Sequence, residues 1–151
     1  MEKQELLNLF SAKIRAVLGR LEVDYEDLEE IRLRAEKPLL VRCGGKEYFA
    51  AENGELSNRK ENGFLVGKKE LMETMEYIAN YSMYAYEEEL KQGYLTVKGG
   101  HRIGVAGKIV MEGDRIVSVK YISFLNVRLS HEKKGCADKI MPFVFQNGGL
   151  C

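Results

Sequence analysis

The chain has 151 residues, and its 23 lysines and arginines balance 23 aspartates and glutamates. This length fits one domain with its own core, and the zero net charge argues against a dedicated nucleic-acid binder, because affinity for phosphate backbones depends on surplus positive charge. The three cysteines form no CxxC pair, so neither a disulfide framework nor a cysteine zinc site is expected. The N-terminus lacks a signal pattern and no apolar run approaches the roughly 18 residues of a membrane helix, so we expect a cytoplasmic domain.

The N-terminal third is expected to contain helices followed by a strand. Apolar residues at helical spacing predict an amphipathic helix over residues 3–21. A short acidic helix over residues 24–28 should follow. Strict alternation in residues 30–34 then predicts a strand that places Arg32 and Arg34 on one face and its two apolar residues on the other.

The middle of the chain predicts a hairpin, a loop and a second helix. Apolar segments flank Gly44 and Gly45, the composition of a hairpin turn that needs positive φ angles. Residues 51–62 are polar and are expected to form an exposed loop. A second amphipathic helix is expected over residues 68–80, with Gly67 where a serine or threonine cap would be stronger.

The second half predicts a helix over residues 84–91, ended by Gly93, and then strands. The strands should form an antiparallel meander over residues 94–97, 102–111, 115–122 and 125–129. A last helix is expected over residues 137–147. The predicted fold class is therefore α+β, with N-terminal and central helices packed on an antiparallel sheet.

Four glycines between residues 99 and 107 invite comparison with a nucleotide-binding loop. A P-loop needs GxxxxGK[ST], so that backbone N–H groups and a lysine surround the phosphates, and the chain contains no such run. The glycines also lie within or between predicted strands, not before a helix. We expect Gly99 and Gly100 to form a hairpin turn, and Gly104 and Gly107 to permit a bulge or close packing.

Three sequence blocks carry a family resemblance: EIRLRAEKPL at residues 30–39, YSMYAYEEELKQGYLTVKGGHRIGVAGK at 81–108, and SFLNVR at 123–128. In these blocks the chain resembles the N-terminal half of the stage III sporulation protein AA family, whose other half is a P-loop ATPase related to type II and type IV secretion motors. The resemblance implies an N-terminal α+β domain over residues 1–134, like the N-terminal domain of secretion ATPases. Residues 135–151 would be a linker or helix leading to an ATPase domain, with its Walker A motif, that this chain lacks.

The resemblance also implies a role for arginines. In related secretion ATPases the N-terminal domain lies over the nucleotide and contributes arginines towards its terminal phosphate. We therefore expect Arg128 first and Arg102 second to sense the nucleotide, with Arg32 and Arg34 on a basic face. The alternative is that each arginine is solvated or pairs with the acidic run at residues 87–89, an exposed pair that stabilises by about 0–1 kcal/mol.

For the full-length protein the resemblance implies ATP and Mg²⁺ as cofactors. Its partners would be its own ATPase domain, neighbouring subunits of a homo-oligomer, expected to be a hexamer, and membrane proteins of a sporulation channel. The protein would then be cytoplasmic and peripheral at the membrane through these partners. For this chain alone we expect no ATPase activity, no catalytic residue, no cofactor and no metal site.

Two other classes of function stay open at this stage. One is a free-standing adaptor that binds a protein through the arginine face. The other is a small nucleic-acid binder that uses the same face together with four tyrosines, at positions 77, 81, 84 and 86, although helical spacing makes core packing the preferred interpretation for them. His101 and His131 have no partner at ligand spacing and are expected to be structural or exposed.

Overall fold

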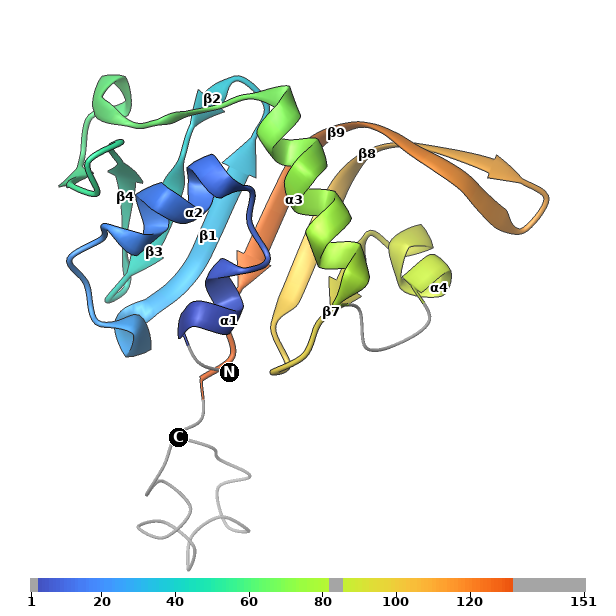
Figure 1. Ribbon diagram of the computed structural model, residues 1–151, viewed down its shortest axis with the longest axis horizontal. Coiled ribbons are helices and arrows are strands. Elements are labelled where there is room, and N and C mark those ends of the chain that lie inside the picture. Colours follow the sequence, from blue (N-terminus) through green and yellow to red (C-terminus); the bar gives the residue numbers. More distant parts are fainter. Residues whose placement is uncertain (1–2, 82–85, 132–151) are drawn as a thin grey trace, which may run out of the picture.

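The computed structural model describes residues 3–81 and 86–131, so the expected linker over residues 135–151 and its helix lie outside the described residues. Seven strands form the main sheet: β1 (Leu28–Arg34), β3 (Leu40–Cys43), β4 (Lys46–Ala50), β5 (Leu56–Ser57), β7 (Tyr94–Thr96), β8 (Arg102–Glu112) and β9 (Arg115–Arg128). Their order is β5-β4-β3-β1-β9-β8-β7, and every pairing is antiparallel (Figure 1). Two short strands, β2 (Lys37–Pro38) and β6 (Leu65–Val66), pair beside it.

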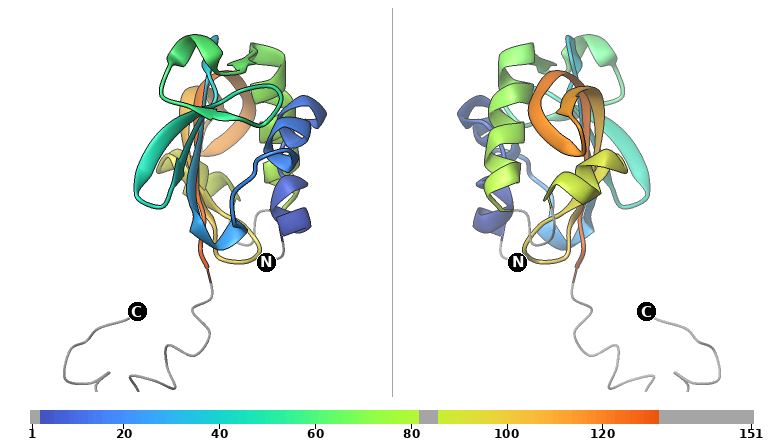
Figure 2. Two further views of the ribbon diagram at one scale, coloured as in Figure 1. Left: turned by 90° about the vertical axis from the view of Figure 1, so that its left-hand side faces the viewer. Right: turned by 90° about the vertical axis from the view of Figure 1, so that its right-hand side faces the viewer.

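The helices are α1 (Lys3–Leu7), α2 (Ala12–Gly19), α3 (Lys68–Asn80) and α4 (Tyr86–Lys91), with single 3₁₀ turns at Tyr25–Asp27 and Lys60–Asn62. The first three cover one face of the sheet. Figure 2 shows α1, α2 and α3 together on the same side of the sheet, whereas α4 lies beside β7. The expected α+β class is therefore confirmed.

The core lies between these helices and the sheet. Strand alternation puts Ile31 and Leu33 of β1 into it, together with Leu125 and Val127 of β9 and apolar residues of α3. All four of these strand residues are fully buried. Because successive side chains of a strand point to opposite faces, the polar residues between them lie on the face opposite α1, α2 and α3.

The single helix expected over residues 3–21 is wrong, because the chain breaks between α1 and α2. In this break the N–H of Ser11 donates to Thr74 Oγ1 of α3 at 3.0 Å. The Arg15 guanidinium donates to the carbonyls of Leu7 and Phe10, at 3.1 and 2.9 Å, and so satisfies groups that the ended helix leaves open. The break also buries Leu9 and Phe10, which are adjacent in sequence.

The strands expected over residues 115–122 and 125–129 are one continuous strand, β9. The register with β8 shifts between Ala106 and Lys108, and Tyr121 takes a φ of 54° there. A Cβ on Gly107 would lie 2.8 Å from the Cα of Ile122, so the expected close packing at this glycine is present. The expected loop over residues 51–62 is also partly wrong, since it contains β5 and a 3₁₀ turn.

Candidate functional site on the open sheet face

The sheet face opposite α1, α2 and α3, here called the open face, carries a row of charged residues from neighbouring strands. Two rows of residues cross it, each made of direct cross-strand neighbours. The first row reads Glu47, Arg42, Glu30, Arg128, Arg102 and Thr96. The second reads Phe49, Leu40, Arg32, Asn126, Gly104 and Tyr94. Residues from six strands thus meet on one surface.

Glu30 occupies the centre of the open face and is only 4% exposed. Its Oε2 accepts from Arg32 Nε at 2.6 Å, and its Oε1 accepts from Asn126 Nδ2 and Arg128 Nε, both at 3.1 Å. Burial alone would raise the pKa of this carboxyl, but the hydrogen bonds from Asn126, Arg128 and Arg32 together hold it below its ordinary value. The carboxylate is therefore ionised at neutral pH.

An alternating series of ion pairs, here called the charge ladder, runs from Glu30 towards β3 and β4. Arg32 Nη2 lies 3.3 Å from Glu47 Oε1, which is also 3.7 Å from Arg42 Nη1. Arg42 Nε in turn lies 3.3 Å from Glu29 Oε2. Because Arg32 and Arg42 each contact two carboxylates, their charges are locally compensated.

Arg102 and Arg128, the exposed arginine pair, lie directly opposite each other on β8 and β9 at the other end of the ladder. Among the described residues, Arg128 hydrogen-bonds to Glu30 through Nε, and its side chain is 74% exposed. The Arg102 guanidinium lies 4.7 Å from the centre of the Tyr94 ring, and no carboxylate among the described side chains pairs with it. Like charges placed opposite each other destabilise a sheet, whereas two adjacent guanidinium groups suit a carboxylate or phosphate.

The arginines singled out from the sequence share this face. Arg32, Arg102 and Arg128 lie in the two rows, and Arg34 lies one step further along β1, opposite Phe124. The Arg34 Nε is buried and has no hydrogen-bond partner in the described part of the chain. The register thus brings all four to one side of the sheet, while their roles towards a nucleotide stay predictions.

The acidic run at residues 87–89, the expected alternative partner, does not supply the partners of Arg32 and Arg128, and the side chain of Glu87 lies outside the described part of the structure. Arg32 and Arg128 pair with Glu30 instead. Glu88 pairs with Lys91, and Glu89 accepts from Thr96 Oγ1 at 3.0 Å. Sequence patterns assigned no role to Glu30 or Asn126, although a carboxylate alternating with arginines in a strand was a usable signal.

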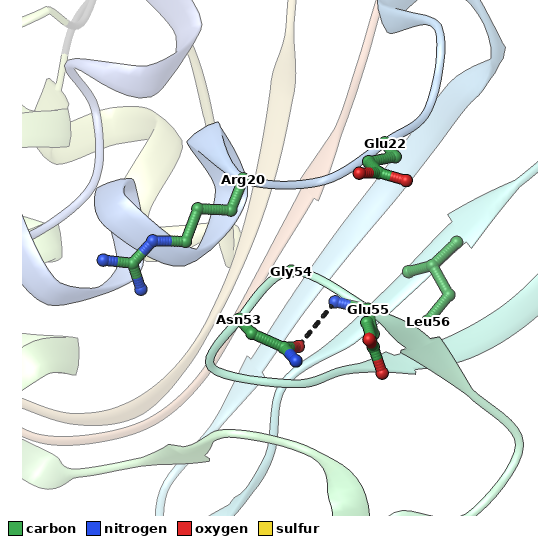
Figure 3. A pocket seen from close by; sticks show the side chains of 6 residues that line it. All are labelled: Arg20, Glu22, Asn53, Gly54, Glu55 and Leu56. Carbon is green, nitrogen blue, oxygen red and sulfur yellow. Dashed lines mark hydrogen bonds between the residues drawn. The ribbon is translucent and has the colours of Figure 1, made fainter.

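One cavity in the described part of the chain lies away from the arginines of the open face. It has a volume of about 410 Å³ and opens between the end of α2 and the turn before β5 (Figure 3). Arg20 Nη1 donates to the Glu52 carbonyl at 2.9 Å, and Asn53 Oδ1 accepts from the Glu55 N–H at 2.9 Å. The lining residues are Arg20, Glu22, Asn53, Gly54, Glu55 and Leu56. Two carboxylates and one guanidinium give this cavity no surplus of positive charge.

Both histidines have structural contacts. His101 is fully buried, and its Nδ1 accepts from the Ser130 N–H at 2.8 Å. Burial lowers the pKa of His101 to about 4, so its imidazole is neutral. His131 Nε2 lies 2.6 Å from the Leu28 carbonyl, and its ring meets Tyr25 edge-on at 4.8 Å. These contacts hold residues 130 and 131 against the sheet.

The core packing expected for the tyrosines is wrong for Tyr77 and Tyr81, which are 38% and 41% exposed. The buried side of α3 is formed by other residues, including Leu71, Met75 and Ile78. Tyr77 instead lies under the Arg15 guanidinium, 5.7 Å from its ring centre. The side chains of the tyrosines at positions 84 and 86 lie outside the described residues. No helix within residues 3–81 and 86–131 is long and apolar enough to span a membrane.

Comparisons with known proteins agree with one another. A family model described as "Sporulation stage III, protein AA" matches residues 1–151. A curated relative, "Stage III sporulation protein AA" of Bacillus subtilis (strain 168), is 33% identical over 148 residues. The match covers 97% of this chain but 44% of the relative, so the chain spans less than half of that protein's length. No solved structure matches significantly.

Proposed function

Because the chain belongs to the family "Sporulation stage III, protein AA", we propose that it is the N-terminal regulatory and oligomerisation domain of a sporulation-associated ATPase. In this proposal the open face covers the nucleotide site of a motor domain elsewhere in the longer protein. The relative's extra length leaves room for such a domain, since the match covers 44% of it. ATP and Mg²⁺ would bind to the motor domain, as the resemblance to secretion ATPases implies.

The exposed arginine pair is the observation that carries this proposal. The charge ladder compensates Arg32 and Arg42. Arg34 is only partly exposed, so the exposed positive charge of the open face is concentrated at Arg102 and Arg128. An arginine placed on a transferring phosphoryl group contributes about 10³ to 10⁵ in rate. In this proposal the exposed arginine pair makes such a contact with the nucleotide.

The same charges explain why the motor domain is needed. A single charge pair at about 4 Å is worth about 1 kcal/mol in water and about 4 kcal/mol near a protein surface. Two arginines without a phosphate loop therefore bind ATP too weakly to use it. We expect the chain alone to hydrolyse no ATP, because the attacking water and Mg²⁺ need groups that a P-loop supplies.

The partners follow from the same proposal. The domain would contact its own ATPase domain and neighbouring subunits in a homo-oligomer, with a hexamer as the expected form. A stable interface between subunits buries more than about 1,000 Å², which the motor domain would help to provide. Membrane proteins of a sporulation channel would bind the assembly and keep it at the membrane surface.

The test is ATP hydrolysis by the full-length protein carrying Arg128→Ala. We expect turnover to fall on the order of 10³, with little change in nucleotide affinity, because the motor domain supplies most of the binding. Arg42→Ala is the matched control, since Arg42 lies on the same face but pairs with Glu29 and Glu47. Unchanged turnover in R128A would refute the arginine role.

A protein-binding adaptor is the second candidate. The exposed arginine pair would bind carboxylates of a partner protein, because a guanidinium fits a carboxylate as well as a phosphate. The two proposals predict different DNA sequences after the codon for Cys151. The motor proposal expects codons for GxxxxGK[ST] within about ten to twenty residues downstream of Cys151, whereas the adaptor proposal expects a stop codon.

A further inference from the structure

Glu30 lies between an arginine that contacts two carboxylates and an arginine that contacts one among the described residues. On one side its Oε2 accepts from Arg32, which also contacts Glu47. On the other side its Oε1 accepts from Arg128, which has no second carboxylate among the described residues. The buried carboxylate of Glu30 therefore contacts two arginines that differ in their number of carboxylate partners.

We propose that Glu30 is a positioning residue for Arg128: it holds the guanidinium through Nε and leaves both terminal nitrogens free for an oxyanion of the nucleotide. Only the identity of the ligand rests on the proposed function. The positioning itself rests on the contacts of Glu30, Arg128 and Asn126 in this chain.

The hydrogen bond to Glu30 restricts the orientation of the Arg128 guanidinium. A guanidinium is a planar fork with five N–H donors, and the recorded contact at 3.1 Å uses the single donor on Nε. An arginine side chain that is 74% exposed would otherwise lose much rotamer freedom on binding a ligand. Because the hydrogen bond to Nε already restricts the Arg128 side chain, less conformational entropy is lost when a ligand binds.

The carboxylate itself is fixed by donors from two strands. Arg32 Nε comes from β1, and Asn126 Nδ2 and Arg128 Nε come from β9. Glu30 and Arg128 are direct cross-strand neighbours, as are Arg32 and Asn126. The register of β1 and β9 thus fixes the rotamer of Glu30, and the fixed carboxylate in turn holds the guanidinium of Arg128.

Glu47 offers a matched control on the same face. It contacts Arg32 and Arg42 but not Arg128. Glu47→Gln therefore removes one negative charge from the charge ladder without touching the exposed arginine pair. Glu30→Gln removes one charge of the same sign, keeps the side-chain shape and weakens the contact with Arg128 Nε.

The first readout is the Nε–H signal of Arg128, measured by NMR on this chain without nucleotide. We expect slow hydrogen exchange in the wild type and in E47Q, and faster exchange with a shifted signal in E30Q. An unchanged Arg128 signal in E30Q would overturn the positioning role. If E30Q does not fold, Glu30→Asp, which keeps the charge but is one methylene shorter, is measured in the same way.

The second readout is turnover of the full-length protein. E30Q should lower kcat by about ten- to a hundredfold, the loss of one charge-assisted hydrogen bond, while the KM for ATP changes less. E30Q/R128A should be no slower than R128A within about twofold, since Glu30 acts through Arg128. Additive losses would overturn the positioning role. If R128A itself hydrolyses ATP normally, the proposed function fails and the NMR readout alone decides the positioning.

Discussion

His101 should make the stability of this domain depend on pH. The residue is fully buried, and burial lowers its pKa to about 4 from a reference value of 6.5. Between these two pH values the unfolded chain binds a proton at His101 and the folded chain does not. The free energy of unfolding is therefore fully retained above pH 6.5 and falls as the pH is lowered towards 4.

The size of this effect follows from the two pKa values. Proton linkage at His101 removes about 2 kcal/mol between pH 7 and pH 5, and about 3 kcal/mol once the pH lies below both values. Glu30 acts in a separate window, because its pKa is lowered from 4.5 and its contribution is lost only in stronger acid. The interval from pH 7 to pH 5 therefore reports mainly on the histidine.

The variant that tests this is His101→Asn. The amide Oδ1 can take the place of Nδ1, which accepts from the Ser130 N–H, but asparagine does not titrate. In urea unfolding at 25 °C, we expect the wild type to lose about 2 kcal/mol between pH 7 and pH 5 and H101N to lose much less. His131→Asn, which keeps His101, should retain the loss. An equal loss in wild type and H101N would show that His101 is not the cause.

Two further predictions concern packing and are measured by urea unfolding at neutral pH. Gly107→Ala should cost about 1–3 kcal/mol, because the new Cβ would lie 2.8 Å from the Ile122 Cα, whereas Gly104→Ala, with 3.8 Å to its nearest neighbour, should cost much less. Equal costs would contradict this account of the bulge. Thr74→Val should cost about 1–3 kcal/mol, because it leaves the buried N–H of Ser11 without its acceptor. Thr74→Ser keeps the hydroxyl and should cost less, and a valine variant as stable as the serine variant would show that the bond contributes little.

Local sequence signals predicted the elements that depend on neighbours in the chain. The helix over residues 68–80 matches α3, because its apolar face repeats without a break. The hairpin between β3 and β4 turns at Gly44 and Gly45, with φ angles of 57° and 80°, as their composition indicated. The alternation in β1 also placed Arg32 and Arg34 on one face.

The features that were missed depend on contacts between distant parts of the chain. The break before α2 is held by Thr74, which is 63 residues from Ser11 in sequence. Glu30 finds Arg128 at a separation of 98 residues. The sequence showed a carboxylate beside two arginines, but which arginine it would hold was decided by the register of β1 and β9. The acidic run at residues 87–89 was equally plausible before that register was known.

If the exposed arginine pair contacts nucleotide phosphates bound by a motor domain, a structure of the full-length protein with a non-hydrolysable ATP analogue and Mg²⁺ will show the contact. We expect a terminal nitrogen of Arg128 about 2.7–2.9 Å from an oxygen of the terminal phosphate, with Glu30 still bound to Nε. A complex in which the open face is turned away from the nucleotide would contradict this expectation.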